Sequence, residues 1–94
     1  MNSNTQAVID ALQGAKQHIN LPSAKAAQEA HEILHLGMGI LQGPHPERFA
    51  LHFWVFFQGG GFNGATAEAM RCVCLVLSVD SWDDVLALLQ DVTR

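Results

Sequence analysis

The chain has 94 residues, which is enough for one domain with one core. Apolar residues make up 49% of it, charged residues make up 15%, and the formal net charge is −4. Its five Lys and Arg residues form no cluster, which argues against binding of nucleic acid or of an anionic membrane, since both need a basic face. The N-terminus lacks the pattern of a signal peptide, and the longest uncharged stretch is interrupted by glycines. We therefore expect a cytoplasmic protein.

The charges are unevenly distributed along the chain. Residues 33–79 hold only four charged side chains, which are Glu47, Arg48, Glu68 and Arg71. A small domain has much surface to cover, so a segment with so few charges is expected to expose apolar groups. Apolar patches of this kind usually mark binding sites, which favours a protein partner or self-association. The alternative is that exposed glycine and alanine account for the imbalance.

The first of five expected helices covers residues 5–18. Its apolar residues recur at helical spacing and are Val8, Leu12, Ala15 and Ile19. The helix ends before Pro22, because proline cannot extend it. Ser23 is a good N-cap for the helix that follows.

The second helix is predicted for residues 24–42. One stripe of its surface is apolar and consists of Ala27, Ala30, Leu34, Met38 and Leu41. Gly43 and Pro44 form a stop signal after it. Gly37 and Gly39 inside the helix have two possible roles: they weaken it, or they permit the close approach of a neighbouring helix.

The third segment, residues 46–58, reads PERFALHFWVFFQ and is apolar nearly all round. Such a helix is either buried or part of an interface. A buried strand is the competing interpretation, because aromatic residues favour sheets, but no other segment offers a strand partner. His52 alone interrupts the apolar run, so its titration is a possible source of pH-sensitive association.

The fourth helix is expected at residues 64–77, with Asn63 as its cap, and the fifth within residues 80–94. Ser81 and Asp84 resemble a capping box at the start of the fifth helix. Its apolar face consists of Val85, Leu88, Leu89 and Val92. The pair Cys72 and Cys74 is too closely spaced to form a disulfide within a helix, so both are expected to be buried thiols. The predicted fold is all-α, with about five short antiparallel helices stacked as helical hairpins in a single domain, residues 1–94.

The stretch HEILH, residues 31–35, resembles the zincin metallopeptidase motif. That resemblance implies that His31 and His35 bind zinc and that Glu32 is the general base. A third ligand is required, and Met38 and Leu41 stand where the longer metzincin pattern has glycine and histidine. The remaining candidates for this ligand are Glu47 and Glu68. Two histidines at the edge of an amphipathic helix explain the motif more simply, so we expect no enzyme, no metal and no cofactor, with a zinc-dependent hydrolase as the alternative.

One part of the chain resembles a tetratricopeptide-type helical hairpin. The residues that carry the resemblance occur in the order Phe49, Phe56, Gly60, Phe62, Ala65 and Leu75. In such a hairpin, large side chains of one helix pack on small ones of the next, which here are Ala65, Ala67, Ala69 and Cys72. No second copy lies one repeat length away, and the usual closing proline is absent near Leu77.

In size, acidity and apolar middle segment, the chain also resembles the small needle-subunit chaperones of type III secretion systems. That resemblance implies a groove that sequesters the amphipathic helix of a polymerising subunit. We therefore predict a small chaperone or adaptor that binds an apolar partner helix, or self-associates, through aromatic residues. The candidate partner-binding residues, each with core packing as the alternative, are Phe49, Phe53, Trp54, Phe56, Phe57 and Phe62. An immunity or inhibitor protein acting as a homodimer is a further alternative.

Overall fold

Five α-helices and two short 3₁₀ helices form the regular structure of this computed structural model, which describes residues 3–59 and 64–90. The α-helices are α1 (Ser3–Ala15), α2 (Ala24–Gln42), α3 (Phe49–Gly59), α4 (Ala65–Leu77) and α5 (Trp82–Leu88). The 3₁₀ helices are η1 (Lys16–His18), which follows α1, and η2 (Pro46–Arg48), which precedes α3. Within the described ranges there is no strand. The prediction of an all-α fold is therefore confirmed, and the strand interpretation of the third segment is wrong.

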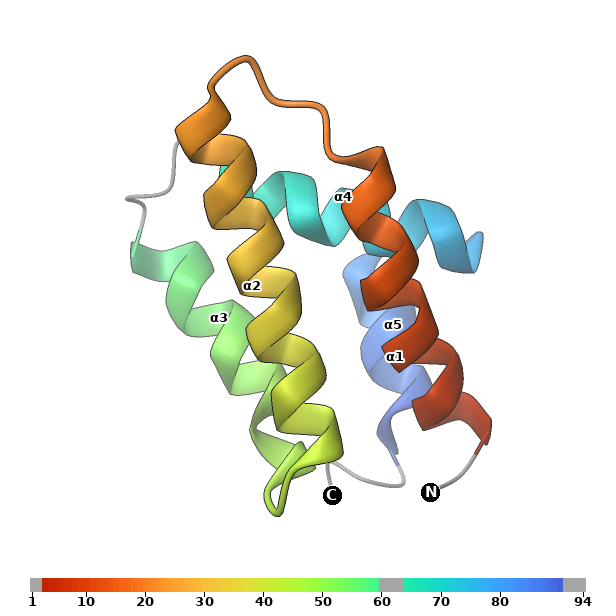
Figure 1. Cartoon of the computed structure of the whole chain (residues 1–94). Coiled ribbons are helices and arrows are strands. Elements are labelled where there is room, and N and C mark those ends of the chain that lie inside the picture. Colours follow the sequence, from red (N-terminus) through yellow and green to blue (C-terminus); the bar gives the residue numbers. More distant parts are fainter. Residues whose placement is uncertain (1–2, 60–63, 91–94) are drawn as a thin grey trace.

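The first three α-helices run antiparallel to their neighbours in the chain (Figure 1). α1 and α2 form one hairpin, and α3 returns alongside α2. α4 crosses behind α1 and α2, and α5 lies behind α1 in the same view. Among the described helices, none lies beside α3 on the left of Figure 1.

α4 is the centre of the packing, because it contacts each of the other four α-helices. Its buried side chains are all small or medium in size and are Ala65, Thr66, Ala69, Cys72 and Val73. Such side chains allow α1 and α2 to approach closely. Ala67, which the sequence pattern groups with them, is exposed, and Cys74 is only half-buried. Large core side chains come from the other helices; full burial of one, such as Leu12, stabilises the fold by about 1.5–3 kcal/mol.

The ends of α2 are set by local hydrogen bonds. The Ser23 hydroxyl accepts a hydrogen bond from the Ala26 N–H at 3.2 Å, and Gly43 donates to the Ile40 carbonyl at 3.2 Å. The boundaries therefore match those predicted from the sequence. The capping box predicted at the start of α5 is also present, with the Ser81 N–H donating to the Asp84 carboxylate at 3.2 Å.

The two glycines inside α2 have different surroundings. A Cβ atom at Gly37 would lie 3.1 Å from Phe49 and 3.2 Å from Phe53, so glycine lets α3 approach α2 closely. A Cβ atom at Gly39 would meet nothing within 4 Å. The close-approach role is therefore correct for Gly37, whereas Gly39 only lowers helix propensity.

A polar cluster formed by Asn20, Glu68 and Arg71, called here the Glu68 latch, joins α4 to the chain after η1. The Glu68 carboxylate accepts hydrogen bonds from the Asn20 N–H at 2.8 Å and from two Arg71 nitrogens at 2.8 and 2.7 Å. The hydrogen bonds from Arg71, with that from Asn20, lower the pKa of Glu68 to about 2. The carboxylate thus stays charged and holds the α1–α2 connection against α4.

Candidate functional site

The inner face of α3 belongs to the core. The side chains of Phe49 and Phe53 are 0% and 1% exposed. Their ring centroids lie 4.9 Å apart, and each ring also packs on Trp82 of α5, at 5.8 Å for Phe49 and 4.6 Å for Phe53. Aromatic pairs at such spacings add to the stability that area burial alone provides. These three rings fix α3 and α5 against each other.

The outer face of α3, defined by Leu51, Trp54 and Val55, points into solvent. These side chains are 57%, 60% and 52% exposed, respectively. Isolated exposed apolar residues are common, but here three large ones lie on one side of a short helix. A helix that is apolar on both its inner and its outer face has more apolar surface than the isolated chain can bury.

A groove next to the outer face runs between α3 and α5 over α4, and is called here the α3/α5 groove. Its volume is about 220 Å³. The residues that line it are Ala50, Phe53, Trp54, Met70, Trp82, Asp83 and Leu86. Six of these seven side chains are apolar, and Trp54 belongs both to the groove and to the exposed face. An apolar side chain from another molecule would find aromatic and aliphatic contacts here.

The six aromatic residues that the sequence predicts for partner binding differ in how far they are buried. Phe49 and Phe53 are core residues of the isolated chain, so their surfaces are already occupied by their own fold. Trp54 is exposed, as a partner-binding residue should be. Phe56 and Phe57 belong to α3, but their side chains lie outside the described residues, as does the whole of Phe62.

Sequence reasoning missed several residues that form this site. Leu51 and Val55 were not separated from the rest of an apolar segment, although their spacing of four residues places them on one side of a helix. Trp82 and Leu86 come from α5, which is far from α3 in the sequence, so only the tertiary fold brings them to the groove. Met70 of α4 completes the groove for the same reason.

His52 lies between the inner and outer faces of α3. Its Nε2 is 3.3 Å from the carbonyl oxygen of Ile33 in α2, and its ring meets Phe53 edge-on with centroids 4.9 Å apart. Burial lowers the pKa of His52, against a smaller opposing effect of the Ile33 carbonyl. The residue therefore holds α3 to α2 in its neutral form.

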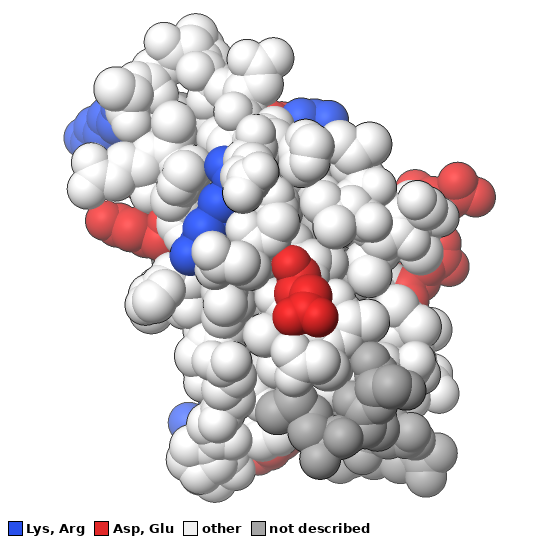
Figure 2. All heavy atoms as spheres, turned by 45° about the vertical axis from the view of Figure 1, so that its right-hand side comes forward, with Lys and Arg blue, Asp and Glu red and all other residues white. Residues whose placement is uncertain are grey.

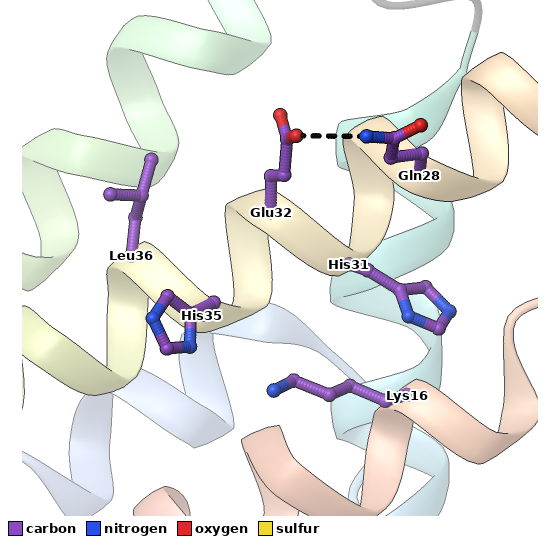
Figure 3. A pocket seen from close by; sticks show the side chains of 6 residues that line it. All are labelled: Lys16, Gln28, His31, Glu32, His35 and Leu36. Carbon is purple, nitrogen blue, oxygen red and sulfur yellow. Dashed lines mark hydrogen bonds between the residues drawn. The ribbon is translucent and has the colours of Figure 1, made fainter.

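The HEILH motif lies on the exposed side of α2, in a second pocket of about 450 Å³ (Figure 3). His31 and His35 lie on the side of α2 that faces Lys16 of η1, and the Lys16 ammonium group lies between the two rings in this view. Glu32 points away from both histidines and accepts a hydrogen bond from Gln28 at 3.4 Å. The carboxylate that a zincin would use as its general base is thus directed away from the two imidazoles.

A metal site needs more ligands than this pocket supplies. Across residues 3–59 and 64–90, no group of three or more His, Cys, Asp or Glu side chains is placed to hold a metal ion. The described residues thus offer a divalent ion two imidazoles at this pocket, fewer than the three or four protein ligands of a zinc site. The nearby Lys16 ammonium group would oppose such an ion.

Charged side chains are widely spaced over much of the surface. Figure 2 shows one face on which separate Lys, Arg, Asp and Glu side chains are divided by broad uncharged areas. No helix among the described residues is both long and apolar enough to cross a membrane. The outer face of α3 and six of the seven residues named in the groove lining are apolar, which suits contact with another protein surface.

The chain matches no protein-family model, and comparisons with curated proteins and with solved structures also find no match.

Proposed function

We propose that this protein is a binding module that takes up an apolar helix of a partner protein on the outer face of α3 and in the α3/α5 groove. The observation that carries the proposal is the exposure of Leu51, Trp54 and Val55 beside a groove lined by aromatic and aliphatic side chains. A helix that lays its apolar side into such a groove uses a common mode of peptide recognition.

The energetics support this proposal. The three exposed side chains together offer on the order of 250 Å² of apolar area, whose burial contributes about 6 kcal/mol before the entropic cost of association is subtracted. Trp54 stands where exposed face and groove meet, and tryptophan is the residue type most often found as a binding hot spot. The groove itself is held open by core aromatic residues, so little ordering is needed on binding.

The chaperone or adaptor role predicted from the sequence is a finer form of the same proposal. The groove implied by the resemblance to needle-subunit chaperones would correspond to the α3/α5 groove. We also propose a cytoplasmic location, which is supported by two free thiols, Cys72 and Cys74, since reducing compartments keep cysteines in this state.

The test uses a synthetic amphipathic peptide with leucine on one side of its helix and glutamine on the other. Calorimetric titration should show binding to the unmodified chain and loss of binding to a Leu51→Ser, Trp54→Ser double variant. The control is Leu75→Ser, which removes a similarly exposed leucine from α4 and should bind as the unmodified chain does. Equal binding by the double variant would contradict the proposal, as would failure of the unmodified chain to bind any helix or a second copy of itself.

A further inference from the structure

Among the described residues that line the α3/α5 groove, one is charged, Asp83. This carboxylate lies in the first turn of α5, is exposed, and makes no hydrogen bond or ion pair with any residue that the structure describes. Its neighbour Asp84 is already engaged, because it accepts the hydrogen bond of the capping box from Ser81. Asp83 is therefore available to a ligand at the edge of an otherwise apolar groove.

A second acidic residue extends this edge. Asp80 lines a neighbouring hollow that shares Met70 and Trp82 with the groove. Arg71 also lines this hollow, but its guanidinium group is engaged by Glu68 in the latch. The charge at the edge of the groove is thus negative, and the described residues that line either hollow include no uncommitted cation.

The sign of this charge discriminates between two possible occupants. A two-fold symmetric dimer joined through the groove would place two copies of the same acidic edge, Asp80 and Asp83, in one interface, because both subunits present the same patch. Like charges at an interface are unfavourable, and each copy already has a net charge of −4. A segment with a cation beside its apolar side chains would instead pair with Asp83 while leucine-type side chains contact Trp54 and Leu86.

We propose that the partner is an amphipathic helix whose apolar side is flanked by Lys or Arg, an inference that rests on the proposed function. Its apolar side chains fill the α3/α5 groove, and one of its cations pairs with Asp83. The partner is thus a different protein rather than a second copy of this chain. The ion pair sets the direction and position of the helix in the groove more than it adds affinity, since it lies at a solvent-exposed edge.

The experiment compares two synthetic helices with the same leucine positions and with either lysine or glutamate at the flanking positions. Calorimetric titration into the unmodified full chain gives the affinity of each helix. Both tryptophans of the chain, Trp54 and Trp82, line the groove, so a shift of tryptophan emission to shorter wavelength reports binding there.

We expect the lysine helix to bind several-fold more tightly than the glutamate helix, because glutamate loses the ion pair with Asp83 and adds repulsion. Asp83→Asn should weaken binding of the lysine helix several-fold, and added salt should reduce this difference. The matched control is Asp10→Asn, which removes one carboxylate from α1 and should leave the affinity nearly unchanged, because Asp10 faces solvent away from the groove lining.

Other outcomes separate this inference from the proposed function. If both helices bind equally, or if Asp10→Asn weakens binding as much as Asp83→Asn, the basic partner is ruled out while the apolar module stands. If neither helix binds but sedimentation shows a dimer in which tryptophan emission has shifted, the occupant is a second copy. If neither helix binds and the chain is a monomer, both proposals fail.

Discussion

The two faces of α3 are alike in sequence and opposite in environment. Phe49 and Phe53 on the inner face are almost fully buried, whereas Leu51 and Trp54, one or two residues away, are more than half exposed. Hydrophobicity alone does not separate them, and helical geometry does. A short helix can thus be a core element and a binding surface together, and substitutions on its two faces should affect different properties.

The largest effect is expected from Phe53→Ala. Loss of a buried ring that packs on Phe49 and Trp82 should lower the free energy of unfolding by about 3–5 kcal/mol. Trp54→Ala should change it by only about 0.5 kcal/mol, because the side chain is mainly in solvent. Urea unfolding of both variants measures the difference, and equal losses would mean that the two faces are not distinct.

The second largest effect on stability is expected at the contact between α2 and the inner face of α3. Gly37→Ala would push against both phenylalanine rings and should destabilise the fold by about 1–3 kcal/mol. Gly39→Ala, in open space one half-turn away, should stabilise it by about 0.5–1 kcal/mol through higher helix propensity. Thermal unfolding of the two variants provides the measurement. A stabilising Gly37→Ala would show that α3 does not approach α2 as closely as described.

Glu68→Gln should lower the stability of the fold without changing peptide binding. The folded-state pKa of Glu68, about 2, lies below its ordinary value, so its charged form stabilises the fold at neutral pH and this contribution is lost as the pH falls from about 4.5 toward 2. At pH 7 the variant should be less stable by about 1–2 kcal/mol, allowing for partial solvent screening.

Two readouts complete this test. Urea unfolding from pH 7 to pH 2 should show the stability difference between the Glu68→Gln variant and the unmodified chain disappearing at the acidic end. Peptide binding at the α3/α5 groove should be unchanged at pH 7, because Glu68 does not line it. A constant difference in stability across the pH range would contradict the role of the charged latch.

A smaller, pH-dependent effect is expected at His52. Its folded-state pKa is lowered by burial, so the unfolded chain takes up a proton first, and stability should fall as the pH drops below the ordinary range of histidine. His52→Gln should remove this part of the pH dependence. The other four histidines are exposed and are present in both proteins. Unfolding free energies of both proteins between pH 8 and pH 5 test this. If the two proteins lose stability equally as the pH falls, His52 is not the cause of the pH dependence.

The smallest effect is expected from zinc. Without a third ligand among the described residues, excess zinc should leave the unfolding temperature unchanged, in the unmodified chain and in His35→Ala alike. Native mass spectrometry of the purified chain checks for bound metal. One stoichiometric zinc, lost in His35→Ala, would move the functional site from α3 to the exposed side of α2.

Much of the fold is predictable from local sequence signals. The boundaries of α2 follow from a serine cap and a Gly–Pro stop, and the start of α5 follows from its capping box, because both depend on neighbouring residues. The end of α1 is less predictable. Its last expected turn is the 3₁₀ helix η1, whose side chains are exposed or half-buried and provide little core packing.

The candidate site is only partly predictable, because it depends on non-local contacts. The sequence identifies the aromatic segment but cannot decide which residues face α2, since every side of that helix is apolar. Gly37 determines which side of α3 faces α2. The two phenylalanines that pack against this glycine belong to the core, and the opposite side of α3 is exposed. The partner helix α5 and its Trp82 could be assigned to the groove only from the tertiary structure.

The central position of α4 has a consequence for synthesis of the protein. α1, α2 and α3 leave the ribosome first, yet the core residues of α1 and α2 pack largely on α4, the fourth helix in the chain. The nascent chain therefore keeps apolar surface open until residues as far as Leu77 have emerged, and domains generally complete folding only once their full unit is available. During that interval, holdase chaperones that recognise apolar segments have the early helices as a target.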